Sequence, residues 1–227
     1  MGTSKPVRGE VALKLYFFGS EMVSQSAYLE IEILYPQELE YLRNIEAHML
    51  AVINEFGIPG LAAPQIGFPI QMVVVRLSGG KRLTLLNPHI ERMYGAETEY
   101  PEGCISCPPG GNRCPTARMQ FINVIGSSIE EPAVVKDWHF SSRDARVVQH
   151  EVDHLAGTFF VDRASVVEKS KVLDQFHQWK HTFKQNGSPN FGLTRGGHNG
   201  RATTSTQAQH SRTVTAGGWN SHLRRLW

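Results

Sequence analysis

The sequence predicts a globular protein that combines helices with antiparallel strands, which is the α+β class. Segments with apolar residues at helical spacing lie on both sides of several runs rich in β-branched residues. The connections between these runs are too short for crossover helices, which favours antiparallel pairing. Hydrophobic residues make up 41% of the 227 residues and charged residues 19%. This balance is typical of a soluble chain with one substantial core.

Three helices are expected. Apolar residues recur at helical spacing over residues 36–56, and Gly57 follows, where a helix C-terminus favours left-handed geometry. A second helix is expected to start within residues 142–144 and to stop at Gly157. A third starts at Ser165-x-x-Glu168, which has the pattern of a capping box.

Four strands are expected between the first two helices. Residues 70–77 and 82–87 read as strands joined by the turn Ser78-Gly79-Gly80. Residues 118–125 and 133–140 show alternating apolar and polar side chains or runs of β-branched residues, so they are also expected to form strands.

The chain divides into three parts. Residues 1–30 form an N-terminal segment without a clear pattern, and residues 31–185 are expected to form the folded domain. Residues 186–227 contain five arginines and no acidic residue, whereas the rest holds 18 basic and 21 acidic residues. We expect this Gly/Ser/Thr-rich tail to be disordered. A charge run of this size is more often simply solvated, and a weak contact with RNA or the ribosome is the alternative.

The sequence excludes several classes of protein. No run of residues approaches the roughly 18 apolar residues that cross a membrane. Three cysteines cannot form a closed disulfide framework, and no secretory signal is evident, so we expect a cytoplasmic protein, with an organelle as the alternative. Because Cys104, Cys107 and Cys114 lie within eleven residues, at least one of them is expected to do chemistry or to bind a metal.

The strongest motif is His150-Glu151-Val152-Asp153-His154. Histidines at i and i+4 of a helix lie on one face and can bind one metal ion, while the Glu beside them can take a proton from water. Two solvated histidines on a surface helix are the alternative. Cys104 is the best third ligand, since three protein ligands leave an open position, as in a catalytic site. Cys104-x-x-Cys107 also resembles half of a structural zinc site. However, 42 residues lie between Cys107 and His150, far more than the dozen or so that separate the cysteines and histidines of a zinc finger.

A third segment of interest is Gly60-Leu61-Ala62-Ala63-Pro64-Gln65. On physical grounds alone, such a loop of small residues serves close packing. Its Gln65 is a neutral side chain with two N–H donors, which suits it to stabilise an oxyanion.

Taken together and in this order, the three segments resemble the peptide deformylase family. The family pattern is G-x-G-x-A-A-x-Q, then E-G-C-x-S, then Q-H-E-x-D-H. Residues 102–106 and 149–154 match fully, whereas residues 58–65 depart at Ile58 and Pro59. The resemblance covers roughly residues 33–180 and identifies residues 31–185 as a deformylase-like catalytic domain.

The resemblance implies a fold and a metal. The family fold is α+β, with antiparallel strands around a central helix that carries the two histidines. Cys104, His150 and His154 would hold one divalent ion, Fe²⁺ in the usual native form, which Zn²⁺, Ni²⁺ or Co²⁺ can replace. The protein would act as a monomer.

The resemblance also implies a reaction. The enzyme would hydrolyse the formyl group from the N-terminal formylmethionine of new polypeptides and release formate. Glu151 would act as general base and then acid, Gln65 and the backbone N–H of Ile105 would form the oxyanion hole, and the backbone of Gly60 would bind the peptide. Val147 lies one turn before His150 and is expected to line an apolar pocket for the methionine side chain.

Two other functions compete with this one. A zincin endopeptidase would cut internal peptide bonds, but it would need no thiolate ligand and would leave the segments around Gln65 and Cys104 unexplained. A degenerate deformylase-like protein would keep the metal site and lack turnover because of Ile58-Pro59.

Overall fold

The structure is a computed structural model, and it describes residues 15–24, 27, 36–108 and 113–186, with residues 183–186 described by their backbone only. The tail predicted to be disordered and most of the N-terminal segment therefore lie outside the described residues. The helices are α1 (Glu21–Ser24), α2 (Pro36–Phe56), α3 (Ser142–Leu155) and α4 (Val166–Asn186), with short 3-10 helices at Ala63–Ile66 and Phe160–Arg163.

Five strands form one sheet in the order β1-β2-β3-β4-β5. They are β1 (Gly60–Ala62), β2 (Met72–Arg76), β3 (Arg82–Glu102), β4 (Cys114–Ser128) and β5 (Glu131–Ser141). Every neighbouring pair is antiparallel, which confirms the predicted direction of pairing.

The predicted strand lengths were wrong for the long hairpin of β3 and β4. The strand predicted for residues 82–87 continues to Glu102, and the one predicted to begin at Arg118 begins at Cys114. Residues 91–101 are exposed on both faces, so no apolar alternation marks them. The pairing of β3 with β4 also shifts register three times, and Gly95 has a φ of 85° at the last of these irregularities. Such bulges break the period-2 pattern on which strand prediction depends.

The helix predictions agree with the structure. Gly57 and Gly157 follow α2 and α3 with φ angles of 65° and 70°, the left-handed geometry that terminates helices. At the start of α4, the backbone N–H of Glu168 donates a hydrogen bond of 3.3 Å to the Ser165 hydroxyl, which is half of the predicted capping box.

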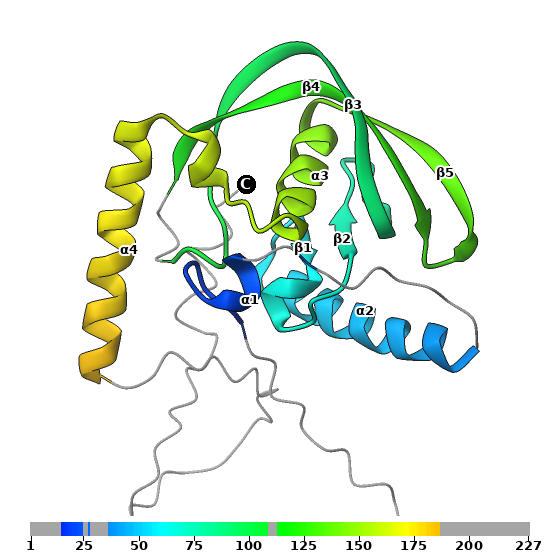
Figure 1. The fold of residues 1–227 in the computed structure, drawn as a ribbon, viewed down its shortest axis with the longest axis horizontal. Coiled ribbons are helices and arrows are strands. Elements are labelled where there is room, and N and C mark those ends of the chain that lie inside the picture. Colours follow the sequence, from blue (N-terminus) through cyan, green and yellow to red (C-terminus); the bar gives the residue numbers. More distant parts are fainter. Residues whose placement is uncertain (1–14, 25–26, 28–35, 109–112, 187–227) are drawn as a thin grey trace, which may run out of the picture.

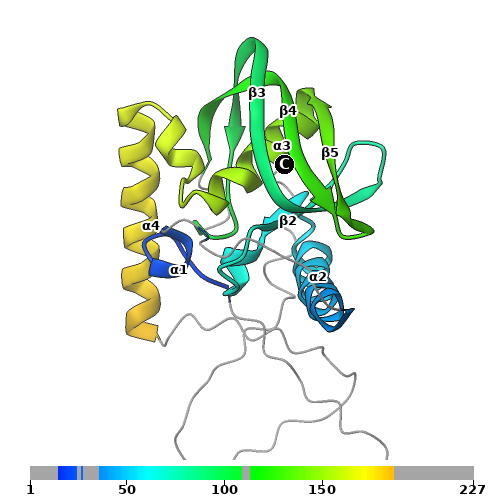
Figure 2. The same cartoon turned by 45° about the vertical axis from the view of Figure 1, so that its right-hand side comes forward.

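Helix α3 lies inside the curve of the sheet, with α4 and α2 toward opposite sides of the molecule (Figure 1). It contacts all five strands, and the turned view shows the long β3–β4 hairpin arching over it (Figure 2). Its Val147 and Val148 pack in one apolar cluster with Val73, Leu85 and Ile122 of the strands. Helix α3 is therefore held by the core, and its side chains have fixed positions.

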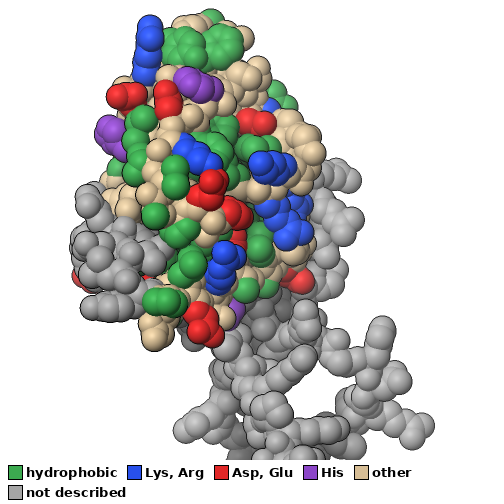
Figure 3. All heavy atoms as spheres, turned by 90° about the vertical axis from the view of Figure 1, so that its right-hand side faces the viewer, with side chains coloured by type: hydrophobic (Ala, Val, Ile, Leu, Met, Phe, Trp, Pro, Cys, Tyr) green, Lys and Arg blue, Asp and Glu red, His purple; other side chains and the backbone are tan. Residues whose placement is uncertain are grey.

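The surface is mixed in character. On the face shown in Figure 3, basic, acidic and apolar side chains are interspersed over the described residues. Among the described residues, no helix combines the length and apolarity needed to cross a membrane.

Candidate metal centre and active site

Helix α3 carries His150, Glu151 and His154. The two imidazole rings lie one turn apart, with centroids 4.9 Å from each other and planes nearly perpendicular. All three side chains are buried. The expectation of two solvated histidines on a surface helix is therefore wrong.

Cys104 approaches these histidines from the segment after β3. Its Sγ lies 3.2 Å from Nε2 of His154, and the ligand atoms of Cys104, His150 and His154 all lie within 4.8 Å of one another. Cys107 and Cys114 are buried free thiols that do not belong to this group of potential ligands. The geometry thus favours a metal site made of Cys104, His150 and His154 over a structural zinc site that uses both Cys104 and Cys107.

The protonation of the two histidines fits a metal ion. Burial, followed by the positive charges of His150 and Arg118, lowers the pKa of His154 well below its ordinary value, so its ring is neutral as a ligand must be. Its Nδ1 is buried and lacks a hydrogen-bond partner within the described part of the chain. Burial opposes charge on His150, yet hydrogen bonds to Cys104 and Glu102 raise its pKa to about 10. A divalent cation can take the place of a proton on His150.

Glu102 orients His150. The carboxylate Oε2 of Glu102 lies 3.1 Å from Nδ1 of His150. Burial opposes ionisation of Glu102, but the hydrogen bond from His150 and the charge of Arg118 outweigh it and lower its pKa to about 2. An ionised Glu102 can accept the Nδ1 proton of His150, which favours the tautomer whose other ring nitrogen can bind a metal, as the outer partners of metal-bound histidines usually do.

Glu151 lies against Gly60 of β1. A Cβ atom built on Gly60 would lie 2.5 Å from Oε1 of Glu151, so only glycine leaves room for this carboxylate. Burial raises the pKa of Glu151 to about 7, against the charges of His150 and Arg118. A carboxyl group with a pKa near neutrality can both take and return a proton.

Hydrogen bonds hold the side chain of Gln65 in the site. Its Oε1 accepts a hydrogen bond of 2.8 Å from the backbone N–H of Ala62. Its Nε2 donates to Sγ of Cys104 at 3.4 Å and to the hydroxyl of Ser106 at 3.1 Å. The N–H donors of the Gln65 amide therefore point toward Cys104 and Ser106, and its oxygen points toward the backbone of Ala62.

A small cavity joins these groups. It is lined by Ile58, Gly60, Gln65, Cys104, Ile105, His150 and Glu151. The residues predicted as metal ligands, proton carrier, oxyanion hole and peptide-binding backbone thus all line this cavity except His154, which lies beside Cys104. Ile58, which replaces a glycine of the family pattern, belongs to the same wall and is buried.

The N-terminal segment ties the two loops of the site together. The backbone N–H of Tyr16 donates to the carbonyl of Gln65 at 2.8 Å, and that of Phe18 donates to the carbonyl of Ser106 at 2.7 Å. This contact could not be predicted from the sequence, because neither Tyr16 nor Phe18 belongs to a recognisable motif.

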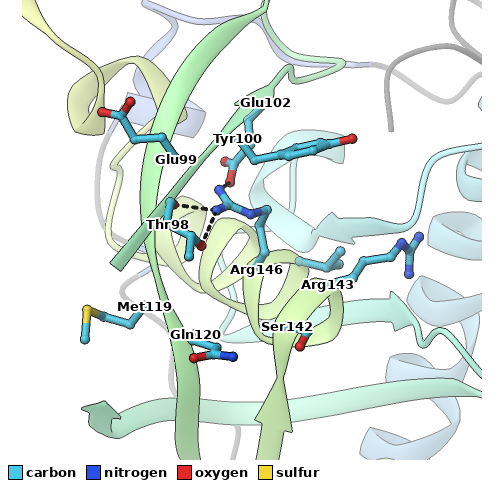
Figure 4. A pocket seen from close by; sticks show the side chains of 10 residues that line it. Thr98, Glu99, Tyr100, Glu102, Met119, Gln120, Ser142, Arg143 and Arg146 are labelled. Atoms are coloured by element: carbon cyan, nitrogen blue, oxygen red, sulfur yellow. Dashed lines mark hydrogen bonds and ion pairs between the residues drawn. The ribbon is translucent and has the colours of Figure 1, made fainter. Parts of the chain in front are cut away.

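A larger pocket of about 410 Å³ lies between the start of α3 and strands β3 and β4, and Glu102, the partner of His150, belongs to its wall (Figure 4). Its wall includes the predicted Val147, together with Tyr100 and Met119, and polar groups from Arg143 and Arg146. The predicted apolar lining is therefore only part of the wall.

Sequence reasoning missed the charged groups behind the ligands. Glu102 stands in the E-G-C-I-S motif, but its contact with His150, 48 residues away, has no local signature. Asp153 accepts from Arg118, and its other oxygen accepts from Arg163 at 2.5 Å.

A thiolate and two histidines around a buried carboxylate are typical of a metal-dependent hydrolase. The profile of the polypeptide deformylase family matches residues 25–170. A peptide deformylase of Desulforudis audaxviator is 32% identical over 142 residues, which cover 63% of this chain and 87% of that protein. Another, from Prochlorococcus marinus, is 30% identical over 185 residues, 77% of this chain and 86% of that protein.

Solved structures agree with this match. A peptide deformylase of Synechococcus elongatus in complex with actinonin has a TM-score of 0.64 and 28% identity, covering 78% of this chain and 92% of that one. The enzyme from Thermus thermophilus has a TM-score of 0.64 and 26% identity, covering 77% and 98%. The chain belongs to the peptide deformylase family. Its reaction is the metal-dependent hydrolysis of the formyl group from the N-terminus of new polypeptides.

Proposed function

We propose that Cys104, His150 and His154 hold one divalent ion per chain and that this ion is Fe²⁺. The supporting observation is the buried group of three ligand atoms within 4.8 Å of one another. A thiolate beside two imidazoles suits iron(II), and Zn²⁺, Ni²⁺ or Co²⁺ can take the same donors. The bound ion supplies Lewis acidity, which makes water a stronger nucleophile and polarises the formyl oxygen.

Glu151 moves the proton in this proposal. It accepts a proton from the attacking water and returns it to the amine that leaves, since an amine is expelled only when it is protonated. The close approach of Gly60 holds the Glu151 carboxylate at the site. The protein therefore supplies a base at the reacting atoms without a conformational change.

Gln65 and the backbone N–H of Ile105 stabilise the oxyanion that forms from the formyl group. Both residues line the small cavity beside Cys104. The Gln65 amide is held by Ala62 and Ser106, so its donors need little reorganisation when charge develops. The backbone of Gly60, which lines the same cavity, binds the peptide.

The substrates are N-formylmethionyl nascent peptides. The pocket of about 410 Å³ that Val147 and Glu102 help to line takes the methionine side chain. We further propose that the enzyme acts as a monomer in the cytoplasm, with an organelle as the alternative, and that the basic tail, residues 186–227, is solvated, with a weak contact with RNA or the ribosome as the alternative.

Release of formate from formyl-Met-Ala-Ser by anaerobically purified protein tests this function. Acetyl-Met-Ala-Ser is the matched control, because it differs only at the acyl group. We expect formate from the first peptide and no acetate from the second. Cleavage between Met and Ala would instead support an endopeptidase, and metal-loaded protein without any product would support the degenerate alternative.

A further inference from the structure

Arg146 cross-links α3 to the two long strands. It lies one helical turn before His150, and its guanidinium makes four hydrogen bonds, of which Figure 4 shows those to Glu102 and Thr98. Nη1 donates to Oε1 of Glu102 at 2.6 Å and to the carbonyl of Thr116 at 2.9 Å. Nη2 donates to the carbonyl and the hydroxyl of Thr98 at 2.7 and 3.1 Å. A planar guanidinium with this many partners is fixed in position and orientation.

The carboxylate of Glu102 is held from two sides. Arg146 and Nε of Arg118 donate to Oε1 at 2.6 and 3.1 Å. Nη2 of Arg118 and Nδ1 of His150 contact Oε2 at 2.9 and 3.1 Å. Arg118 also binds Asp153, so its guanidinium is shared between two acids. Both arginines link Glu102 to the helix that carries His150, Arg118 through Asp153 and Arg146 directly from α3 itself.

We propose that Arg146 is a positioning residue for the metal centre. It fixes the Glu102 carboxylate relative to α3, and Glu102 in turn fixes the ring orientation and the tautomer of His150. This inference rests on the proposed metal site. It adds that the affinity and geometry of that site depend on a guanidinium that touches neither the metal ligands nor the reacting atoms.

The expected effect is moderate. Loss of a partner behind a metal-bound histidine typically weakens metal binding by about 10–100-fold. Because Arg118 still holds Glu102 when Arg146 is removed, we expect the low end of this range, roughly tenfold. Lysine cannot replace Arg146, since one ammonium cannot reach acceptors on both strands and Glu102 with the geometry of a planar fork.

The test uses Co²⁺ as the probe on the metal-depleted full chain. Its dissociation constant is measured by competition with a chelator, and the visible spectrum reports on the thiolate and imidazole ligands. Arg146→Met and Arg146→Lys are expected to bind Co²⁺ about tenfold more weakly and with an altered spectrum. Arg143→Met is the matched control for metal binding. It removes a guanidinium from the same helix, but Arg143 donates to the carbonyl of Arg76 instead of Glu102.

A double-mutant cycle separates positioning from a purely structural role. If Arg146 acts through Glu102, Arg146→Met adds little to the loss of Co²⁺ affinity in a Glu102→Gln background. Additive losses, or a lower melting temperature with unchanged affinity and spectrum, would overturn the proposal. If Arg146→Met does not fold, the same readouts are taken from Arg146→Lys. A wild-type chain that binds no Co²⁺ would refute the proposed metal site itself, which is a different outcome.

Discussion

Substitution of Gly60 by alanine tests how closely the site is built around Glu151. The added Cβ would lie 2.5 Å from Oε1 and 2.8 Å from Cγ of Glu151, whereas ordinary van der Waals contact begins at 3.4 Å. The carboxylate must therefore retreat by about 0.9 Å. Since Glu151 is only 1% exposed, it has little room to do so. A misplacement of about 1 Å at a catalytic group can cost about a hundredfold in rate.

We therefore expect Gly60→Ala to lower kcat/KM for formyl-Met-Ala-Ser by about a hundredfold, or about 2.7 kcal/mol in transition-state stabilisation. The metal content should stay at one ion per chain, because the atoms nearest to the added Cβ belong to Glu151 and to none of the three proposed ligands. Gly79→Ala is the matched control, since nothing lies within 4 Å of a Cβ there. The reasoning fails if Gly60→Ala keeps at least half of the wild-type activity with its metal in place.

Further predictions concern the base, the tail and the cysteines. Glu151→Gln should keep its metal and lose at least about a hundredfold in formate release, because the near-isosteric amide cannot transfer the proton. A chain ending at Asn186 should deformylate normally, since the removed residues include none of the proposed site; a folded but inactive truncation would refute this. Cys104→Ser should lose metal sharply, because a hydroxyl is a poor ligand at neutral pH. Cys107→Ser and Cys114→Ser should each retain metal and most activity, and metal analysis of the three variants decides the point.

The sequence predicted best those features that have a local signature. Helix α2 follows from apolar spacing, and Gly57 and Gly157 mark the ends of α2 and α3, where the structure has left-handed backbone. Cys104, His150 and His154 could be named because their motifs are short and their chemistry restricts the residue types. The structure brings these three side chains together without any correction to the list.

Features that depend on distant contacts could not be predicted. Strand β3 is stabilised along residues 91–101 by pairing with β4, while both of its faces are exposed there, so hydrophobic alternation carries no information. The role of Arg146 depends on acceptors at Thr98, Glu102 and Thr116, which reach it only after α3 packs inside the sheet. A buried arginine on a helix has no spacing rule that reveals its partners.

Reloading of the metal-depleted chain tests the central claim most directly. Protein dialysed against a chelator is titrated anaerobically with Fe²⁺ while formate release from formyl-Met-Ala-Ser is followed. The proposed site predicts no formate without metal, a linear rise in activity, and a sharp end point at one ion per chain. Formate release from the metal-free chain, or an end point that does not move when Cys104 is replaced by serine, would contradict the assignment of Cys104, His150 and His154 as the ligands of the catalytic ion.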